Sequence, residues 1–248
     1  MELIIISGLA RVGKTTLANL LAKESFELGL VPKLLSFADP LKKEAEERGY
    51  SKEKDNEEYR KFCQEFGAMF RKVNPNHWVD LFEIELNIIL KEEKLELYKN
   101  NPYWERCVIV DDCRYQNEVG LGLKNNATMI FLSSGTRELS EANATWREHH
   151  SEELARAIED GDEEKIQWYD CHLLNDGDVK GLSIKARAMA PIWCGIQANA
   201  LTTNLEDLSN SGSLEGMDNM LNDLIDILLK EFEDGEEDDD PVPDDGCD

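Results

Sequence analysis

The residues that most clearly indicate chemistry form the octapeptide at positions 8–15, GLARVGKT. It fits the pattern G-x-x-x-x-G-K-[ST], in which glycines let several backbone N–H groups point at one phosphate. The lysine then reaches the β- and γ-phosphates of a nucleotide, and the following hydroxyl is a Mg²⁺ ligand. We therefore expect ATP and Mg²⁺ here. The residues expected to bind ATP are Gly8, Arg11, Gly13, Lys14, Thr15 and Thr16, with Lys14 catalytic and Thr15 on the metal.

The alternative for this octapeptide is a glycine turn between two core elements. The apolar run at 3–6 precedes the motif, and Leu17, Leu20 and Leu21 recur at helical spacing after it. A strand, a glycine-rich turn and a helix are the context that a phosphate loop requires. This context favours the phosphate loop.

A second group of chemical residues lies in the segment VIVDDCRYQNE at 108–118. Asp111 and Asp112 could hold Mg²⁺ through water or orient the attacking group, and Arg114 could grip a phosphate with two N–H donors. Glu118 could orient Arg114 or meet a ligand hydroxyl. The alternative is a pair of acids at a strand end with a solvated arginine.

The helical pattern at 59–72 carries polar side chains on one face. Arg60, Gln64, Gly67 and Arg71 share this face, and Lys61 adjoins it. Donors around a small residue suit an anionic, planar ligand, although the pattern alone favours a solvated amphipathic helix. Mid-helix glycine costs about 1 kcal/mol relative to alanine, so we expect a ligand or a helix to approach closely there.

Two further segments contain candidate site residues. Asp39 ends the run SFAD and either receives a sugar or base or caps a helix as its N-cap; the two interpretations are equally weighted. Arg137 and Arg147 lie in a lid-like segment at about 134–160, where they would neutralise charge on the transferring phosphoryl group. His149 and His150 have no third ligand at useful spacing, so zinc is not expected.

Composition restricts the class of protein. The chain has 248 residues and a net charge of −25, which argues against nucleic acid as a partner. It has no apolar run of 18 residues, no basic export segment before its first strand, and six cysteines without metal-site or disulfide-framework spacing. These features predict a cytoplasmic protein whose partners are small molecules, with no membrane association.

Short apolar runs alternate with helical patterns and predict an α/β fold with a five-stranded parallel sheet covered on both faces. We expect strands at 2–7, 33–38, 107–111, 127–132 and 170–175, and helices at 57–72, 78–97 and about 179–190. Ligands of such sheets bind beyond the carboxyl ends of the strands. The candidate residues named above follow these ends or lie in the helical insert at about 40–104.

The expected organisation is one domain with a C-terminal extension. Residues 1–190 form the domain, 191–213 a linker, and 214–232 an amphipathic helix that packs on the core or on a second subunit, which makes a homodimer possible. Residues 233–248 carry ten acids and no base, and are expected to be disordered.

Several of these motifs together resemble the bacteriophage-type deoxynucleoside monophosphate kinases. They are the phosphate loop, SFADPLK, R-K-x-x-Q-x-x-G followed by N-P-N-H-W-V, D-C-R-Y-Q-N-E, H-H-S-E and L-L-N-D-G, in family order over about residues 1–185. The resemblance implies a P-loop kinase that transfers the γ-phosphoryl group of ATP to a deoxynucleoside 5′-monophosphate in a host cytoplasm. It implies substrate contacts for Arg60, Lys61, Gln64, Gly67, Trp78, Asp112, Arg114 and Glu118.

The chain departs from the family at Ala68, where a hydroxyl residue is expected, and in the extension after about residue 190. Two other functions therefore stay open. One is a P-loop kinase for a nucleoside or a coenzyme precursor, and the other is an ATPase that transfers the phosphoryl group to water. The arginine-bearing insert favours a second phosphorylated ligand over water.

Overall fold

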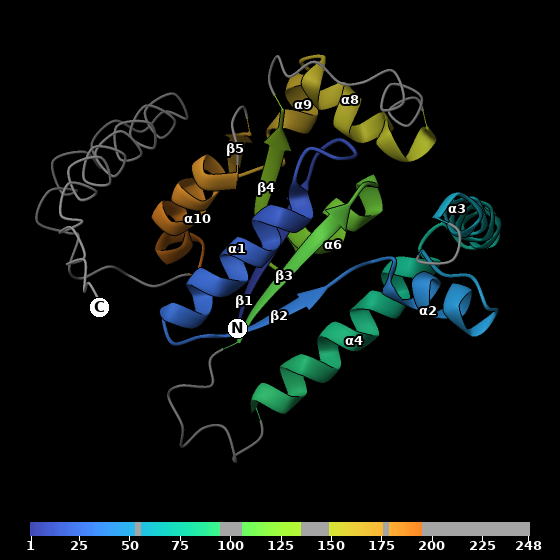
Figure 1. Cartoon of the computed structure of the whole chain (residues 1–248), viewed down its shortest axis with the longest axis horizontal. Coiled ribbons are helices and arrows are strands. Elements are labelled where there is room, and N and C mark those ends of the chain that lie inside the picture. The colour runs from blue at the N-terminus through green and yellow to red at the C-terminus, as the bar shows by residue number, and fades with distance from the viewer. Residues whose placement is uncertain (53–55, 95–105, 135–148, 176–178, 195–248) are drawn as a thin grey trace, which may run out of the picture.

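The computed structural model describes residues 1–52, 56–94, 106–134, 149–175 and 179–194. Within these residues five strands form one parallel sheet in the order β2-β3-β1-β4-β5 (Figure 1). The strands are β1 (Glu2–Ser7), β2 (Val31–Leu35), β3 (Arg106–Cys113), β4 (Thr128–Ser133) and β5 (Cys171–Leu174). The predicted α/β class with a parallel sheet is confirmed.

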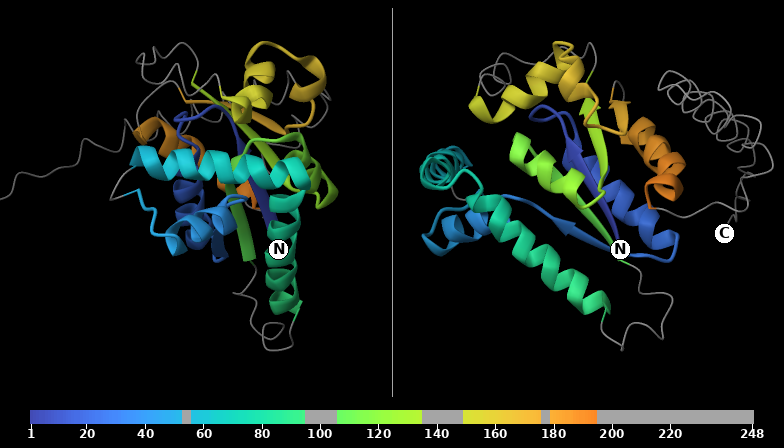
Figure 2. Two further views of the ribbon diagram at one scale, coloured as in Figure 1. Left: turned by 90° about the vertical axis from the view of Figure 1, so that its right-hand side faces the viewer. Right: turned by 180° about the vertical axis from the view of Figure 1, so that it is seen from behind.

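The described helices alternate with the strands along the chain, and the last one follows β5. They are α1 (Lys14–Glu27), α2 (Asp39–Glu47), α3 (Asn56–Val73), α4 (His77–Lys94), α6 (Gln116–Lys124), α8 (Glu153–Glu159), α9 (Glu163–Ile166) and α10 (Val179–Trp193). A short 3₁₀ turn, η2 (His150–Glu152), precedes α8. Helices therefore occupy much of the predicted insert, where α3 runs across the N-terminal end of α4 (Figure 2).

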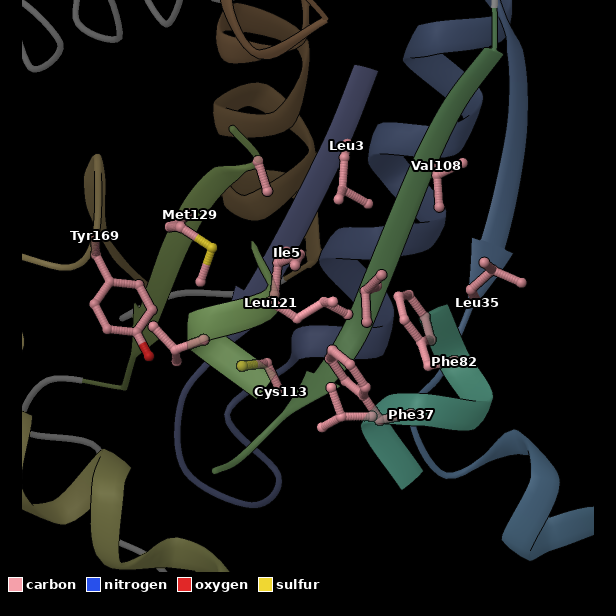
Figure 3. Close-up of a cluster of buried hydrophobic side chains, with 14 of the residues drawn as sticks. Leu3, Ile5, Leu35, Phe37, Phe82, Val108, Cys113, Leu121, Met129 and Tyr169 are labelled. Atoms are coloured by element: carbon pink, nitrogen blue, oxygen red, sulfur yellow. The ribbon is translucent and has the colours of Figure 1, made fainter. Parts of the chain in front are cut away.

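Helices bury both faces of the sheet. Side chains of a strand alternate between the two faces, so neighbouring residues of one strand belong to different clusters. Leu3 and Ile5 of β1 belong to a cluster with apolar side chains of α4, α6 and α8 (Figure 3). Ile4 and Ile6 belong to a second cluster with side chains of α1 and α10. Each fully buried isoleucine stabilises the fold by roughly 1.5–3 kcal/mol. The predicted covering of both faces is confirmed.

The second strand ends earlier than predicted. It stops at Leu35 rather than at residue 38, because the carboxylate of Asp112 accepts the N–H groups of Phe37 and Ala38 and turns the chain out of the sheet. Helix α2 then begins at Asp39, so Ala38 is the N-cap and the predicted N-cap role of Asp39 is wrong.

The last described helix is longer than predicted. Helix α10 passes through Pro191 and ends at Trp193, so residues 191–193 are not part of a linker. A proline disfavours a helix interior, but here Ala190, Trp193 and Cys194 are buried in the cluster of α1 and α10. Tertiary packing of these apolar side chains offsets the local cost of the proline.

Several predictions lie outside the described residues. These are Arg137 and Arg147, most of the lid-like segment, the apolar stripe at 214–232 and the acidic tail at 233–248. The lid and the homodimer stay predictions. Among the described helices, none combines the length and the apolar character needed to cross a bilayer.

Candidate active site

The loop between β1 and α1 requires glycine at two positions. Gly8 and Gly13 have φ angles of +138° and +108°, which L-residues with a side chain rarely adopt. A Cβ atom at Gly8 would also collide with the carbonyl oxygen of Leu132, and one at Gly13 would lie 2.7 Å from Nδ2 of Asn175. The backbone thus curls at the carboxyl edge of β1, and α1 begins directly after the curl with Lys14.

The side chain of Lys14 folds back on this loop. Its Nζ donates hydrogen bonds to the carbonyl oxygens of Gly8 (2.7 Å) and Leu9 (2.8 Å). Burial, followed by the nearby Arg114, lowers the pKa of Lys14 to about 8. A bound anion such as a phosphate would stabilise the charged form of this buried ammonium group, which lies near a second cation.

Asn175 supports the loop from the end of β5, a role that was not predicted from the sequence. Its Nδ2 donates to the carbonyl oxygen of Val12 at 2.7 Å, and its backbone N–H donates to Ser133 at 2.7 Å. The side chain is buried, so this bond is protected from water. In the sequence Asn175 is marked only as the last residue of the fifth predicted strand and as the asparagine of the L-L-N-D-G motif.

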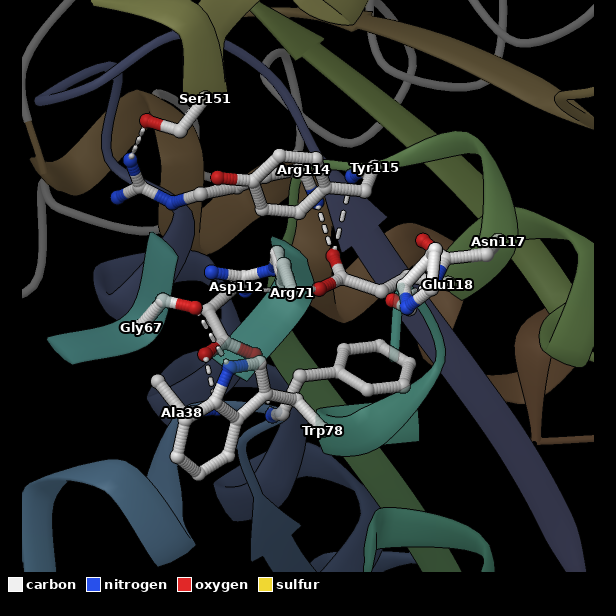
Figure 4. Close-up of polar contacts among 12 residues, drawn as sticks. Ala38, Gly67, Arg71, Trp78, Asp112, Arg114, Tyr115, Asn117, Glu118 and Ser151 are labelled. Carbon is white, nitrogen blue, oxygen red and sulfur yellow. Dashed lines mark hydrogen bonds and ion pairs between the residues drawn. The ribbon is translucent and has the colours of Figure 1, made fainter. Parts of the chain in front are cut away.

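The two adjacent acids at the end of β3 have different partners, because successive side chains of a strand point to opposite faces of the sheet. Asp111 accepts a hydrogen bond from the Thr15 hydroxyl at 2.5 Å. Asp112 instead accepts bonds from Ser36 Oγ and from the N–H groups of Phe37 (2.8 Å) and Ala38 (3.0 Å) (Figure 4).

This division decides which predicted metal ligands fit Mg²⁺. The hydroxyl of Thr15 and the carboxylate of Asp111 lie together beside the phosphate loop, and Mg²⁺ prefers such oxygen ligands with several waters retained. They fit the ion. The predicted metal role of Asp112 is not favoured, because its oxygens are engaged with the turn before α2.

Glu118 holds the turn after β3. It is buried, and its Oε2 accepts the N–H groups of Arg114 (2.7 Å) and Tyr115 (3.1 Å) (Figure 4). Its Oε1 lies 3.7 Å from the guanidinium of Arg71. Burial, with a smaller effect from Asp112, raises the pKa of Glu118 to about 7. Of the two predicted roles, the geometry favours orientation of Arg114 over contact with a ligand hydroxyl.

The side chain of Arg114 reaches toward Ser151 and Glu152, which lie in the described part of the predicted lid-like segment. Its Nη1 forms an ion pair with Glu152 and lies 3.3 Å from the hydroxyl of Ser151. The second oxygen of Glu152 accepts the N–H of Ala10 at 2.7 Å, so this carboxylate also contacts the phosphate loop. In the sequence, Glu152 belongs to the H-H-S-E motif and to the predicted lid-like segment, with no role of its own predicted.

Lys14, Thr15, both acids of β3, Arg114 and Glu152 line one cleft of about 590 Å³ at the carboxyl edge of the sheet. The phosphate loop and the start of α1 form one wall, and α3 contributes Tyr59, Arg60, Cys63, Gln64 and Arg71. The guanidinium of Arg71 lies 4.1 Å from the centre of the Tyr115 ring, which holds it as a cation–π pair. The cleft thus combines phosphate-loop residues with the predicted donors Arg60, Gln64 and Arg71.

Five predicted substrate residues do not line this cleft, namely Asp39, Lys61, Gly67, Trp78 and Glu118. Lys61 is exposed, and Asp39 is paired with Lys42 at 2.9 Å. Trp78 is buried and donates its indole N–H to the carbonyl oxygen of Gly67 at 3.2 Å, which ties α3 to α4 (Figure 4).

Gly67 lets a neighbouring helix approach. A Cβ atom there would lie 3.2 Å from Leu41 of α2 and 3.1 Å from Nη1 of Arg71. The close approach expected from a mid-helix glycine is present, and it involves protein side chains.

No protein-family model matches the chain, and no curated protein sequence matches it. Its function is therefore inferred from its own residues and their geometry.

Proposed function

We propose that this chain is an ATP-dependent deoxynucleoside monophosphate kinase. The observation that carries the proposal is a single cleft with a phosphate loop at one wall and Arg60, Gln64 and Arg71 at another. Arg114 lines the same cleft. A donor and a phosphorylated acceptor could therefore bind within reach of each other.

The donor would bind at the loop. Backbone N–H groups of a curled loop at a helix N-terminus form a cradle for phosphates, and Lys14 adds a buried positive charge. Bound Mg²⁺, held through Thr15 and Asp111, would supply charge neutralisation between the donor phosphates. Lys14 would exchange its bonds to the Gly8 and Leu9 carbonyls for phosphate oxygens.

The acceptor would bind between α3 and the end of β3. Arginine suits a phosphate because its planar guanidinium offers paired N–H donors, and Gln64 offers both a donor and an acceptor to a base. An ATPase that transfers phosphoryl groups to water needs no wall of this kind. The resemblance to the phage-type kinases is the basis for the choice of a deoxynucleoside monophosphate.

The chemistry needs little beyond positioning and charge. In phosphoryl transfer the transition state spreads charge over the equatorial oxygens, so cations close to these oxygens lower the barrier. Lys14 and Arg114 line the cleft and would do this. The predicted lid residues Arg137 and Arg147 would add to them on closure.

The deciding experiment measures ADP formation from ATP·Mg²⁺ alone and then with each common ribo- or deoxyribonucleoside monophosphate. Product nucleoside diphosphates are identified by anion-exchange chromatography. We expect turnover that requires a deoxynucleoside monophosphate. Equal ADP formation without an acceptor would indicate an ATPase, and turnover only with nucleosides or coenzyme precursors would indicate another small-molecule kinase.

A matched pair of variants excludes contaminating kinases. Lys14→Ala should lower kcat by about 100-fold or more, because it removes a charge that faces the transferring group. Lys23→Ala, an exposed lysine on the same helix, should retain wild-type turnover. Equal activity in Lys14→Ala and wild type would refute the kinase proposal.

A further inference from the structure

We infer that Glu152 is a positioning residue that fixes the guanidinium of Arg114 beside the phosphate loop. The inference rests on the proposed kinase function and deepens it, because it assigns the orientation of the acceptor-side arginine to a residue outside the loop and outside α3. Glu152 acts on the substrate through Arg114.

The two oxygens of Glu152 have different partners. Oε1 forms an ion pair with Nη1 of Arg114, and Oε2 accepts the N–H of Ala10 at 2.7 Å. The carboxylate is almost fully buried, with 2% of its side chain exposed. One carboxylate therefore joins the loop after β1 to the end of β3, and the partial burial of the pair strengthens the charge-assisted bond.

The backbone at Glu152 has contacts of its own. Its backbone N–H donates to the carbonyl oxygen of His149 at 2.9 Å, and the imidazole of His149 accepts the N–H of Ser151 at 3.2 Å. Helix α8 follows directly, and its Leu154 and Ile158 are buried against the sheet. The backbone of Glu152 is therefore held by the 3₁₀ turn and by the packing of α8. This argues for a fixed support rather than a carboxylate that competes with a bound phosphate.

Charge explains why a support is needed. Lys14 is buried, and it lines the same cleft as Arg114. Two cations thus face the same cleft, and the Glu152 carboxylate offsets their repulsion. The guanidinium has five N–H donors, so Nη1 can be held by Glu152 and Ser151 while the others face a phosphate.

The kinetic test is a double-mutant cycle between Glu152 and Arg114. In Glu152→Gln the amide oxygen can still accept the Ala10 N–H, but no negative charge faces Arg114. We expect kcat/KM for the monophosphate to fall 10- to 100-fold, while the Kd of a non-hydrolysable ATP analogue with Mg²⁺ changes less than threefold. In an Arg114→Ala background, Glu152→Gln should lower kcat/KM for the monophosphate by less than a further twofold. The exposed neighbour Glu153→Gln is the control and should behave as wild type.

A second measurement is independent of catalysis. The Nη and Nε signals of Arg114 are recorded by ¹⁵N NMR and assigned with Arg114→Lys. We expect slowly exchanging Nη protons in wild type and in Glu153→Gln, and their loss in Glu152→Gln.

The two proposals can fail separately. If wild type phosphorylates no monophosphate but the Arg114 signal is lost in Glu152→Gln, the kinase proposal fails and the positioning role stands. The positioning role would be overturned if the Arg114 signals were unchanged in Glu152→Gln. It would also be overturned if the fold-loss of kcat/KM in the double variant equalled the product of the losses in the two single variants.

Discussion

At the scale of single residues, two neighbours on α3 face different surroundings. Arg60 lines the cleft, whereas Lys61 is exposed and does not. Loss of a charged hydrogen bond costs about 1.5–3 kcal/mol, so we expect Arg60→Ala to raise KM for the monophosphate by roughly 10- to 100-fold. Lys61→Ala should leave KM unchanged, and KM for ATP should be unaffected in both. Steady-state kinetics with each substrate varied checks this, and equal effects of the two substitutions would contradict it.

A second prediction at this scale concerns pH. The pKa of Glu118 is raised to about 7, above its unfolded value near 4.5, so the folded state binds more protons between these values. The stabilisation is therefore present at low pH and declines as pH rises toward 7, by at most about 1.4 kcal/mol per pH unit. Urea unfolding from pH 4.5 to 7.5 checks it. In Glu118→Gln this contribution should disappear, and parallel curves for wild type and variant would contradict the prediction.

At the scale of elements, the position of α3 depends on its contact with α4. The indole of Trp78 donates to the carbonyl oxygen of Gly67, and α3 carries the cleft residues Arg60, Gln64 and Arg71. Trp78→Phe leaves that carbonyl without this donor, at a cost of about 1 kcal/mol. We expect a lower Tm and a several-fold higher KM for the monophosphate, with ATP binding unchanged.

The control for this prediction is Trp168→Phe, a half-buried tryptophan after α9. It should change Tm without changing KM for the monophosphate. If Trp78→Phe lowered Tm and left both KM values unaltered, α3 would not need this contact to hold its donors.

At the scale of the whole molecule, the cleft is cationic although the chain is strongly acidic. Arg11, Lys14, Arg60, Arg71 and Arg114 line it, while the net charge is −25. Nine acids lie at 234–248, and like charges so close together repel one another. We expect removal of 234–248 to leave kcat nearly unchanged and to raise stability slightly.

The alternative for the acidic segment is competition with substrate for the cationic cleft. Full-length and 1–233 proteins are therefore compared by steady-state kinetics at low and high salt. A several-fold lower KM for the truncated protein at low salt, lost at high salt, would show that the segment competes and that our expectation is wrong.

The sequence by itself determined the local features of this protein. The glycines and Lys14 in the octapeptide specify a curled loop before a helix, because φ preferences and helix starts depend on neighbouring residues. The apolar runs specify buried strands, and their alternation with helices specifies a parallel sheet. Ligand residues at the carboxyl ends of strands followed from that topology.

Only the tertiary structure decided how the candidate residues divide their roles. The side chains of Asp111 and Asp112 differ because one meets Thr15 and the other the turn before α2. Glu152 meets Ala10 across 142 residues of chain, and Trp78 holds α3 instead of facing the cleft. Such contacts depend on how distant elements pack, and no spacing along the chain encodes them.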